Sequence, residues 1–189
     1  YINSEWNSHH KKFADIKVCF CFPDVYELGA SNLGLEILYH IVNSRPDALA
    51  ERCYCPDADL EEILRKQNIC LSSLESQTSH KKFDIVGFSL QHELCFTNVL
   101  TMLDLANIPV YSKDRTNTLN NNTTYPLIIA GGPVCSNPEP VADFFDAVVL
   151  GEGEDVINEI IECVRESKLK TKSKNELLVS LAQISGVYI

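Results

Sequence analysis

The chain has 189 residues, 45% of them apolar, and a formal net charge of −10. This length and apolar content suit one α/β domain with a sizeable core. The acidic balance disfavours contact with nucleic-acid phosphates, and the apolar runs fall far short of the roughly 20 residues that a membrane span needs. We therefore expect neither nucleic acid nor membrane as a partner. No signal peptide opens the chain, which predicts a cytoplasmic protein.

The chain begins at Tyr1 rather than at Met and stops within the apolar run Val187-Tyr188-Ile189, which has β-propensity. We interpret it as a domain fragment of a longer protein. Its composition predicts a lead-in segment over residues 1–14, an α/β domain over residues 15–167, and a linker with a short helix over residues 168–189.

Compact apolar runs with the character of buried parallel strands recur along the chain. They are Ile16–Phe22, Glu51–Cys55, Phe83–Leu90, Leu127–Ala130 and Ala147–Leu150. Helical periodicity is expected after most of them, from about Leu33, Pro56, Glu93 and Val156, and again over Glu176–Ile184. Residues 112–125 are polar and aperiodic, so we expect a flexible surface insertion there. The alternation predicts a doubly wound, flavodoxin-like, five-stranded parallel sheet with helices on both faces.

The chain contains eight cysteines, most of them within apolar runs. A domain of this size does not need disulfides, so we expect reduced thiols packed in the core. The two cysteines of each pair, Cys19/Cys21 and Cys53/Cys55, would point to the same face of a strand. A strand buried on both faces offers no open coordination site, and no Cys-x-x-Cys occurs. The pattern therefore favours core packing over ligation, and we assign no metal ligand.

Ligands of open α/β sheets bind beyond the carboxyl ends of the strands, where this chain has polar and glycine-rich loops. The candidate cofactor-binding residues in these loops are Asp24, Tyr26, Gly29, Ser89, Gln91, Gly131, Gly132, Pro133, Gly151, Glu152 and Gly153. The paired glycines suit either a close approach of a ligand or a tight turn. The polar residues after the third strand could equally cap the next helix. No nucleophile, base and orienting group are spaced as a triad, so no catalytic residue is assigned.

Several of these loops together resemble the N-terminal region of a large radical SAM (Fe-S oxidoreductase) protein family. The matching runs include Phe22-Pro23-Asp24-Val25-Tyr26-Glu27-Leu28-Gly29, Phe88-Ser89-Leu90-Gln91-His92-Glu93-Leu94, Asn137-Pro138-Glu139-Pro140 and Gly151-Glu152-Gly153-Glu154. The resemblance implies a cobalamin-binding-like domain ahead of a radical SAM barrel in the same chain. The barrel would hold the [4Fe-4S] cluster and S-adenosylmethionine. This segment would be an accessory domain that covers the barrel and positions a corrinoid or substrate, and is not catalytic alone.

The first loop departs from the cobalamin-binding pattern at one position. Asp24, Tyr26 and Gly29 have the spacing Asp-x-Tyr-x-x-Gly, whereas the domains that ligate cobalt have Asp-x-His-x-x-Gly. A phenol is a poor substitute for the imidazole ligand, so the resemblance here implies cobalamin bound without His ligation. Two alternatives stay open: a stand-alone flavodoxin-like module that binds flavin or another small molecule, and a structural domain that has lost its ligand.

Overall fold

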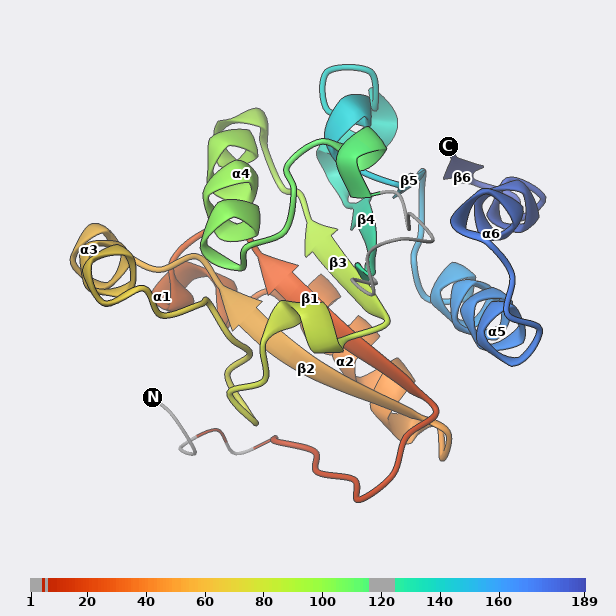
Figure 1. Ribbon diagram of the computed structural model, residues 1–189, viewed down its shortest axis with the longest axis horizontal. Coiled ribbons are helices and arrows are strands. Elements are labelled where there is room, and N and C mark those ends of the chain that lie inside the picture. Colours follow the sequence, from red (N-terminus) through yellow and green to blue (C-terminus); the bar gives the residue numbers. More distant parts are fainter. Residues whose placement is uncertain (1–4, 6, 116–124) are drawn as a thin grey trace.

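A computed structural model of the chain describes residue 5, residues 7–115 and residues 125–189. Its centre is a six-stranded sheet of order β2-β1-β3-β4-β5-β6 (Figure 1). The first five strands pair in parallel, and β6 pairs antiparallel with β5. The strands are β1 (Ile16–Phe22), β2 (Ala48–Tyr54), β3 (Ile85–Ser89), β4 (Leu127–Gly131), β5 (Ala147–Val149) and β6 (Val187–Tyr188).

The five predicted parallel strands are confirmed, but the predicted strand count is wrong by one. The chain end folds back as β6 and pairs Val187 with Val149. Gly186 permits this return because its φ of 83° suits glycine, and its carbonyl accepts a hydrogen bond from the amide of Leu150 at 2.7 Å. Sequence periodicity did not reveal the sixth strand because two residues are too few to show an alternation.

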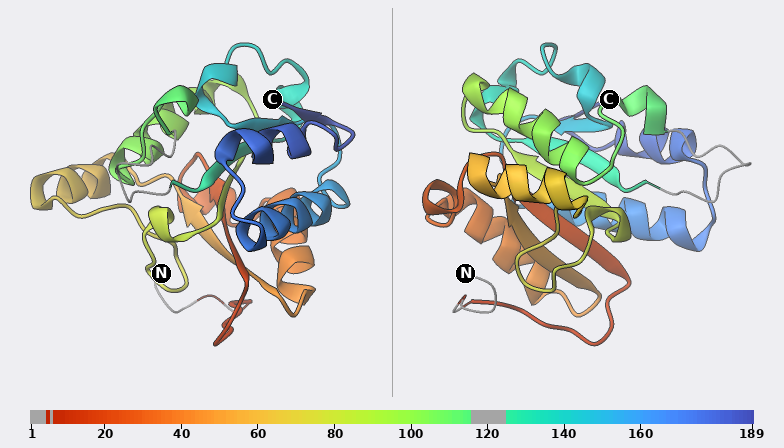
Figure 2. Two further views of the ribbon diagram at one scale, coloured as in Figure 1. Left: turned by 45° about the vertical axis from the view of Figure 1, so that its right-hand side comes forward. Right: turned by 60° about the vertical axis from the view of Figure 1, so that its left-hand side comes forward.

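Helices cover both faces of the sheet, as the alternation predicted. They are α1 (Tyr26–Gly29), α2 (Leu33–Ser44), α3 (Ala58–Gln67), α4 (Phe96–Leu105), α5 (Val156–Leu169) and α6 (Lys174–Leu181). Helices α2 and α5 pack on one face, and α3 and α4 pack on the other (Figures 1 and 2). No helix in the described part of the chain is long and apolar enough to cross a membrane.

The segments that we predicted as a linker with a short helix and as a surface insertion each contain a buried residue. The segment over residues 168–189, predicted as a linker and short helix, contains the end of α5, all of α6 and β6, and Leu181 is fully buried. The predicted insertion over residues 112–125 begins with a 3-10 helix, Ser112–Arg115, whose last residue is buried. Residues 116–124 of this insertion lie outside the described residues, as do residues 1–4 and 6 of the lead-in.

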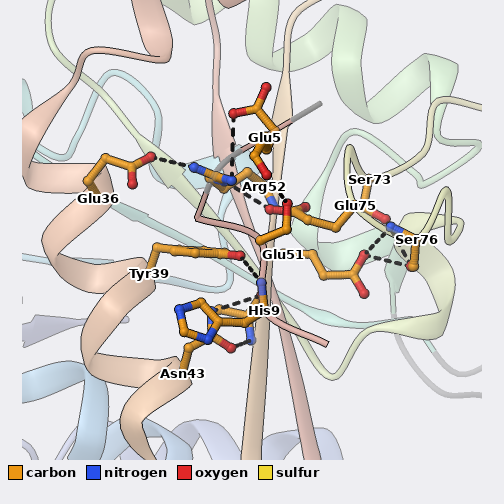
Figure 3. Close-up of polar contacts among 12 residues, drawn as sticks. Glu5, His9, Glu36, Tyr39, Asn43, Glu51, Arg52, Ser73, Glu75 and Ser76 are labelled. Atoms are coloured by element: carbon orange, nitrogen blue, oxygen red, sulfur yellow. Dashed lines mark hydrogen bonds and ion pairs between the residues drawn. The ribbon is translucent and has the colours of Figure 1, made fainter. Parts of the chain in front are cut away.

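Strand β2 stands at the edge of the sheet, yet all of its residues are buried. A segment spanning residues 71–80 runs beside it, and the amide of Leu74 donates to the carbonyl of Arg52 at 2.7 Å. The carboxylate of Glu75 accepts from the amide of Arg52 at 2.7 Å and from its Nε at 2.8 Å. Figure 3 shows the guanidinium of Arg52 between Glu75 and Glu36, above the ring of Tyr39. This covering removes a free strand edge that could pair with other chains.

A second buried ion pair joins elements far apart in the sequence. The side chains of Arg115 and Asp146 are fully buried and lie 3.0 Å apart. Arg115 also donates to the carbonyls of Pro109 and Phe144, and Lys174 at the start of α6 donates to the same Asp146 oxygen at 2.7 Å. Because both cations converge on one carboxylate, that carboxylate connects η3 (Ser112–Arg115) to β5 and α6.

Replacement of that carboxylate by an amide should be strongly destabilising. Asp146→Asn keeps the shape of the side chain but leaves the buried Arg115 without its counter-charge, which is expected to cost about 3 kcal/mol of unfolding free energy. The measurement is urea denaturation. The matched control is Asp155→Asn at the exposed start of α5, expected to change stability by less than about 1 kcal/mol. Equal effects of the two variants would show that the buried pair does not stabilise the fold.

Gly29 ends α1 against the aromatic part of the core. A methyl group on its Cα would lie 2.5 Å from Cδ1 of Tyr54 and 2.7 Å from Cδ1 of Phe22, closer than carbon atoms approach. Both rings are buried and have little room to move. The lack of a side chain at Gly29 is therefore required by packing.

Gly29→Ala should lower the free energy of unfolding by about 1–3 kcal/mol, because the two rings must shift to admit the methyl group. The control is Gly34→Ala, five positions along the chain in α2, where the methyl group meets only an ordinary 3.5 Å contact with the side chain of Asn32. This control should be neutral or stabilising by up to about 1 kcal/mol, because alanine favours helix. Thermal and urea unfolding of both variants provide the comparison.

Candidate functional site

A cavity of about 540 Å³ opens at the carboxyl ends of β3, β4 and β5. It lies between the sheet and the layer of α2 and α5, and its volume is within the range of small-molecule sites. Its inner wall is apolar and consists of Phe20, Leu35, Leu38, Ile129, Val149, Ile157 and Ile160. Gly87, in the middle of β3, also lines it and adds no side chain to its floor.

The predicted site residues from the loops after β3, β4 and β5 all line this cavity. They are Ser89, Gln91, Gly131, Gly132, Pro133, Gly151, Glu152 and Gly153. The Nε2 of Gln91 donates to the Oγ of Ser89 at 2.9 Å, so the two polar side chains after β3 form one unit at the mouth. The structure thus brings together residues that are more than 60 positions apart in the sequence, because parallel strands present their carboxyl ends at one edge.

The two glycines that follow β4 have different roles. Gly132 has a φ of 117°, and a Cβ there would lie 2.4 Å from the carbonyl oxygen of Leu90. It therefore makes the close approach between the loops after β3 and β4, where the amide of Leu90 donates to the carbonyl of Gly131 at 2.7 Å. A Cβ on Gly131 would meet only Val149 at 3.7 Å, an ordinary contact. Gly132 is thus required by the turn, whereas Gly131 leaves space at the cavity.

The loop after β5 contributes carboxylates to the mouth. Glu152 and Glu154 both line the cavity where the chain approaches α5. The side chain of Asp155, at the start of that helix, makes no capping hydrogen bond. Three acidic side chains at this helix start repel a phosphate group, although the helix end itself would attract one. The mouth is therefore suited to ligands that donate hydrogen bonds.

The first predicted loop does not line the cavity. Asp24 accepts a hydrogen bond from the amide of Val25 at 2.8 Å, which holds the turn. The ring of Tyr26 packs edge-on against Tyr54 with ring centroids 5.2 Å apart, and its hydroxyl donates to Glu5. Gly29 packs on the same aromatic cluster. These three residues therefore make packing and turn contacts. They do not join the candidate residues that line the cavity.

Sequence reasoning missed the apolar inner wall of the cavity. Its residues are indistinguishable in sequence from ordinary core residues, because strands and helices of a doubly wound fold are apolar throughout. Gly87 is the one signal that was available, since a glycine inside a strand often marks a place where a ligand or another backbone comes close.

Comparison with known proteins identifies relatives of this chain. Residues 34–189 match the family described as radical SAM proteins, N-terminal. An uncharacterized protein of Methanocaldococcus jannaschii is 26% identical over 147 residues, which cover 76% of this chain and 26% of that protein. The structure of the radical S-adenosylmethionine methyltransferase TsrM from Kitasatospora setae, with a tryptophan substrate and a SAM analogue bound, is similar with a TM-score of 0.51 and 13% identity.

The structural match covers 80% of this chain and 26% of the TsrM chain, so this chain spans about a quarter of the length of each relative. At 13% identity the likeness to TsrM is one of fold. The family match, in contrast, extends over most of the chain and includes the loops after β3, β4 and β5. This chain belongs to the family of N-terminal domains of radical SAM proteins.

Proposed function

We propose that this chain is an accessory domain whose cavity positions a corrinoid or the substrate opposite the radical SAM barrel of the same polypeptide. The observation that carries the proposal is the cavity at the carboxyl edge, into which the loops after β3, β4 and β5 converge. The parallel strands follow the order 2-1-3-4-5 of flavodoxin-like sheets, which bind ligands at this edge. This order supports a flavodoxin-like, cobalamin-binding-like domain with one added antiparallel strand.

The chemistry of the cavity suits a corrinoid in two respects. A corrinoid has a heteroaromatic base at the end of a flexible tail, and the apolar inner wall between the sheet and α2 and α5 suits such a flat ring. A corrin ring also carries peripheral carboxamides, which donate hydrogen bonds. Ser89, Gln91 and Glu152 at the mouth provide acceptors for such groups.

The position of Tyr26 supports binding without a protein ligand to cobalt. Its ring is packed against Tyr54, and it does not line the cavity. The [4Fe-4S] cluster and S-adenosylmethionine would belong to the barrel, because this sequence has no Cys-x-x-x-Cys-x-x-Cys motif. The contribution of this chain is then to bind, to orient and to exclude water, and the radical chemistry takes place in the rest of the polypeptide.

Flavin binding is the second candidate, because the same strand order and cavity would accept an isoalloxazine ring. The acidic mouth at Glu152 and Glu154 argues against it, since FMN ends in a phosphate monoester of charge about −2, which these carboxylates repel more strongly than the singly charged phosphodiester of a corrinoid tail. A domain that has lost its ligand is the third. One experiment, titration of the protein with each ligand while its melting temperature is measured, distinguishes the three candidates. A ligand that binds only the folded state raises the melting temperature.

We expect hydroxocobalamin to shift in absorption and to raise the melting temperature of the full-length protein, and FMN to do neither. At a ligand concentration of about 100 times Kd the gain is about 2.7 kcal/mol. Gly131→Val should weaken corrinoid binding by about tenfold or more, because its side chain occupies the cavity mouth. The variant should fold, since a Cβ at this position makes an ordinary contact and valine suits a strand.

Tyr26→Phe is the matched control for the same titration. It removes only a hydroxyl that lies outside the cavity, so corrinoid affinity should change by less than about twofold. If Tyr26→Phe abolishes binding and Gly131→Val does not, the corrinoid site lies at the first loop and not in the cavity. Stabilisation by FMN alone would favour the flavin module, and no response to either ligand would favour the structural domain.

A further inference from the structure

Four potential metal ligands meet on the face of the sheet opposite to the cavity. Cys19 and Cys21 are two apart on β1 and so point to the same face. Cys53 on β2 is in register with Cys21 and lies in the same core cluster. His80, the first residue of η1 (His80–Lys82), is the last residue of the segment 71–80 that covers the edge of β2. All four residues are buried, with at most 3% of their surface exposed.

The distances among three of these groups, those of Cys19, Cys21 and His80, suit a metal site. The sulfur atoms of Cys19 and Cys21 are 4.0 Å apart. One ligand atom from each of Cys19, Cys21 and His80 lies within 4.8 Å of the other two. Two sulfurs bound to one tetrahedral zinc at about 2.3 Å are separated by about 3.8 Å. Small side-chain movements would therefore bring the three atoms to bonding distance of a common ion.

The tautomer of His80 is the one that binds metals. Its Nδ1 lies 3.1 Å from the carbonyl oxygen of Leu71, and because a carbonyl only accepts, Nδ1 must carry the hydrogen. In the neutral ring Nε2 then has a free lone pair. Within the described part of the chain this buried atom has no hydrogen-bond partner. A backbone carbonyl that holds one ring nitrogen while the other binds the ion is the usual outer-shell arrangement of metal-binding histidines.

A histidine that only packs in a core normally has both ring nitrogens hydrogen-bonded. The thiol of Cys53 is not the missing partner of His80, because it donates to the carbonyl of Ser72 at 3.5 Å. The unpartnered nitrogen of His80 beside two sulfurs is thus the feature that packing leaves unexplained. A cation among these atoms would satisfy it.

We propose that Cys19, Cys21 and His80, with Cys53 as the fourth ligand, bind one zinc ion in a closed structural site. Thiolate and imidazole ligands in tetrahedral arrangement are typical of zinc, and burial of all four residues leaves no open position for substrate. Binding releases the three thiol protons to solvent, so three thiolates, a neutral imidazole and Zn²⁺ form a complex of net charge −1. The ion would join β1, β2 and the segment that covers the sheet edge.

Zinc analysis of the 189-residue chain and of the full-length protein tests this proposal. Because the site is closed, the protein is unfolded with a chelator and refolded with Zn²⁺. We expect about one zinc per chain and a higher melting temperature than in refolding without metal. Refolding with Co²⁺ should give the thiolate charge-transfer and tetrahedral d–d absorption bands. His80→Gln should lose these bands, or bind Co²⁺ at least about tenfold more weakly.

Two further sets of variants keep the test decisive if His80→Gln fails to fold. Cys21→Ala and Cys53→Ala remove a ligand but keep a small apolar side chain, and should also lose the cobalt bands. Cys163→Ser and His92→Gln lie outside the cluster and should bind zinc as the unaltered chain does. Substoichiometric zinc in the refolded chain, or zinc content that is the same in Cys21→Ala and Cys163→Ser, would overturn the site and leave a core of reduced thiols.

Discussion

The buried ion pair between Arg52 and Glu75 is the interaction on which the arrangement of this domain depends. Strand β2 is at the edge of the sheet and contains Arg52. The carboxylate of Glu75 accepts hydrogen bonds from both the amide and the guanidinium of Arg52. The side chains of Arg52 and Glu75 are 4% and 0% exposed, so the loss of Arg52 would leave the carboxylate of Glu75 buried without its counter-charge. This pair holds residues 71–80 against β2, closes the edge, and sets the position from which His80 reaches the core.

The alternation of side chains along β1 separates the two candidate sites. Phe20 points to the face covered by α2 and α5 and forms part of the ligand cavity. Its neighbours Cys19 and Cys21 point to the opposite face and belong to the thiol cluster. A site for a small molecule and a site for a structural ion can therefore share one strand without contact between their ligands, because the pleat directs adjacent residues to opposite sides.

Family membership and site geometry together change the interpretation of the loop after β1. Its Asp-x-Tyr-x-x-Gly spacing resembles a cobalt-ligating loop, yet Tyr26 and Gly29 pack against Tyr54 rather than line the cavity. The turn needs its glycine for packing reasons alone. The loops after β3, β4 and β5 line the cavity in which we propose the ligand site, whereas the hydroxyl of Tyr26 donates to Glu5.

The sequence by itself determined the five parallel strands, the helices on both faces and the loops that meet at the cavity, because apolar periodicity and glycine placement are local signals. It did not predict β6, which is too short to show a period, or the burial of Arg115, whose partner Asp146 is 31 positions away. It also favoured packing over ligation for the cysteine pairs, because a strand buried on both faces offers no open coordination site and no Cys-x-x-Cys occurs. Only the tertiary structure decided that His80 lies beside Cys19 and Cys21, since that contact depends on how a long segment closes the edge of the sheet.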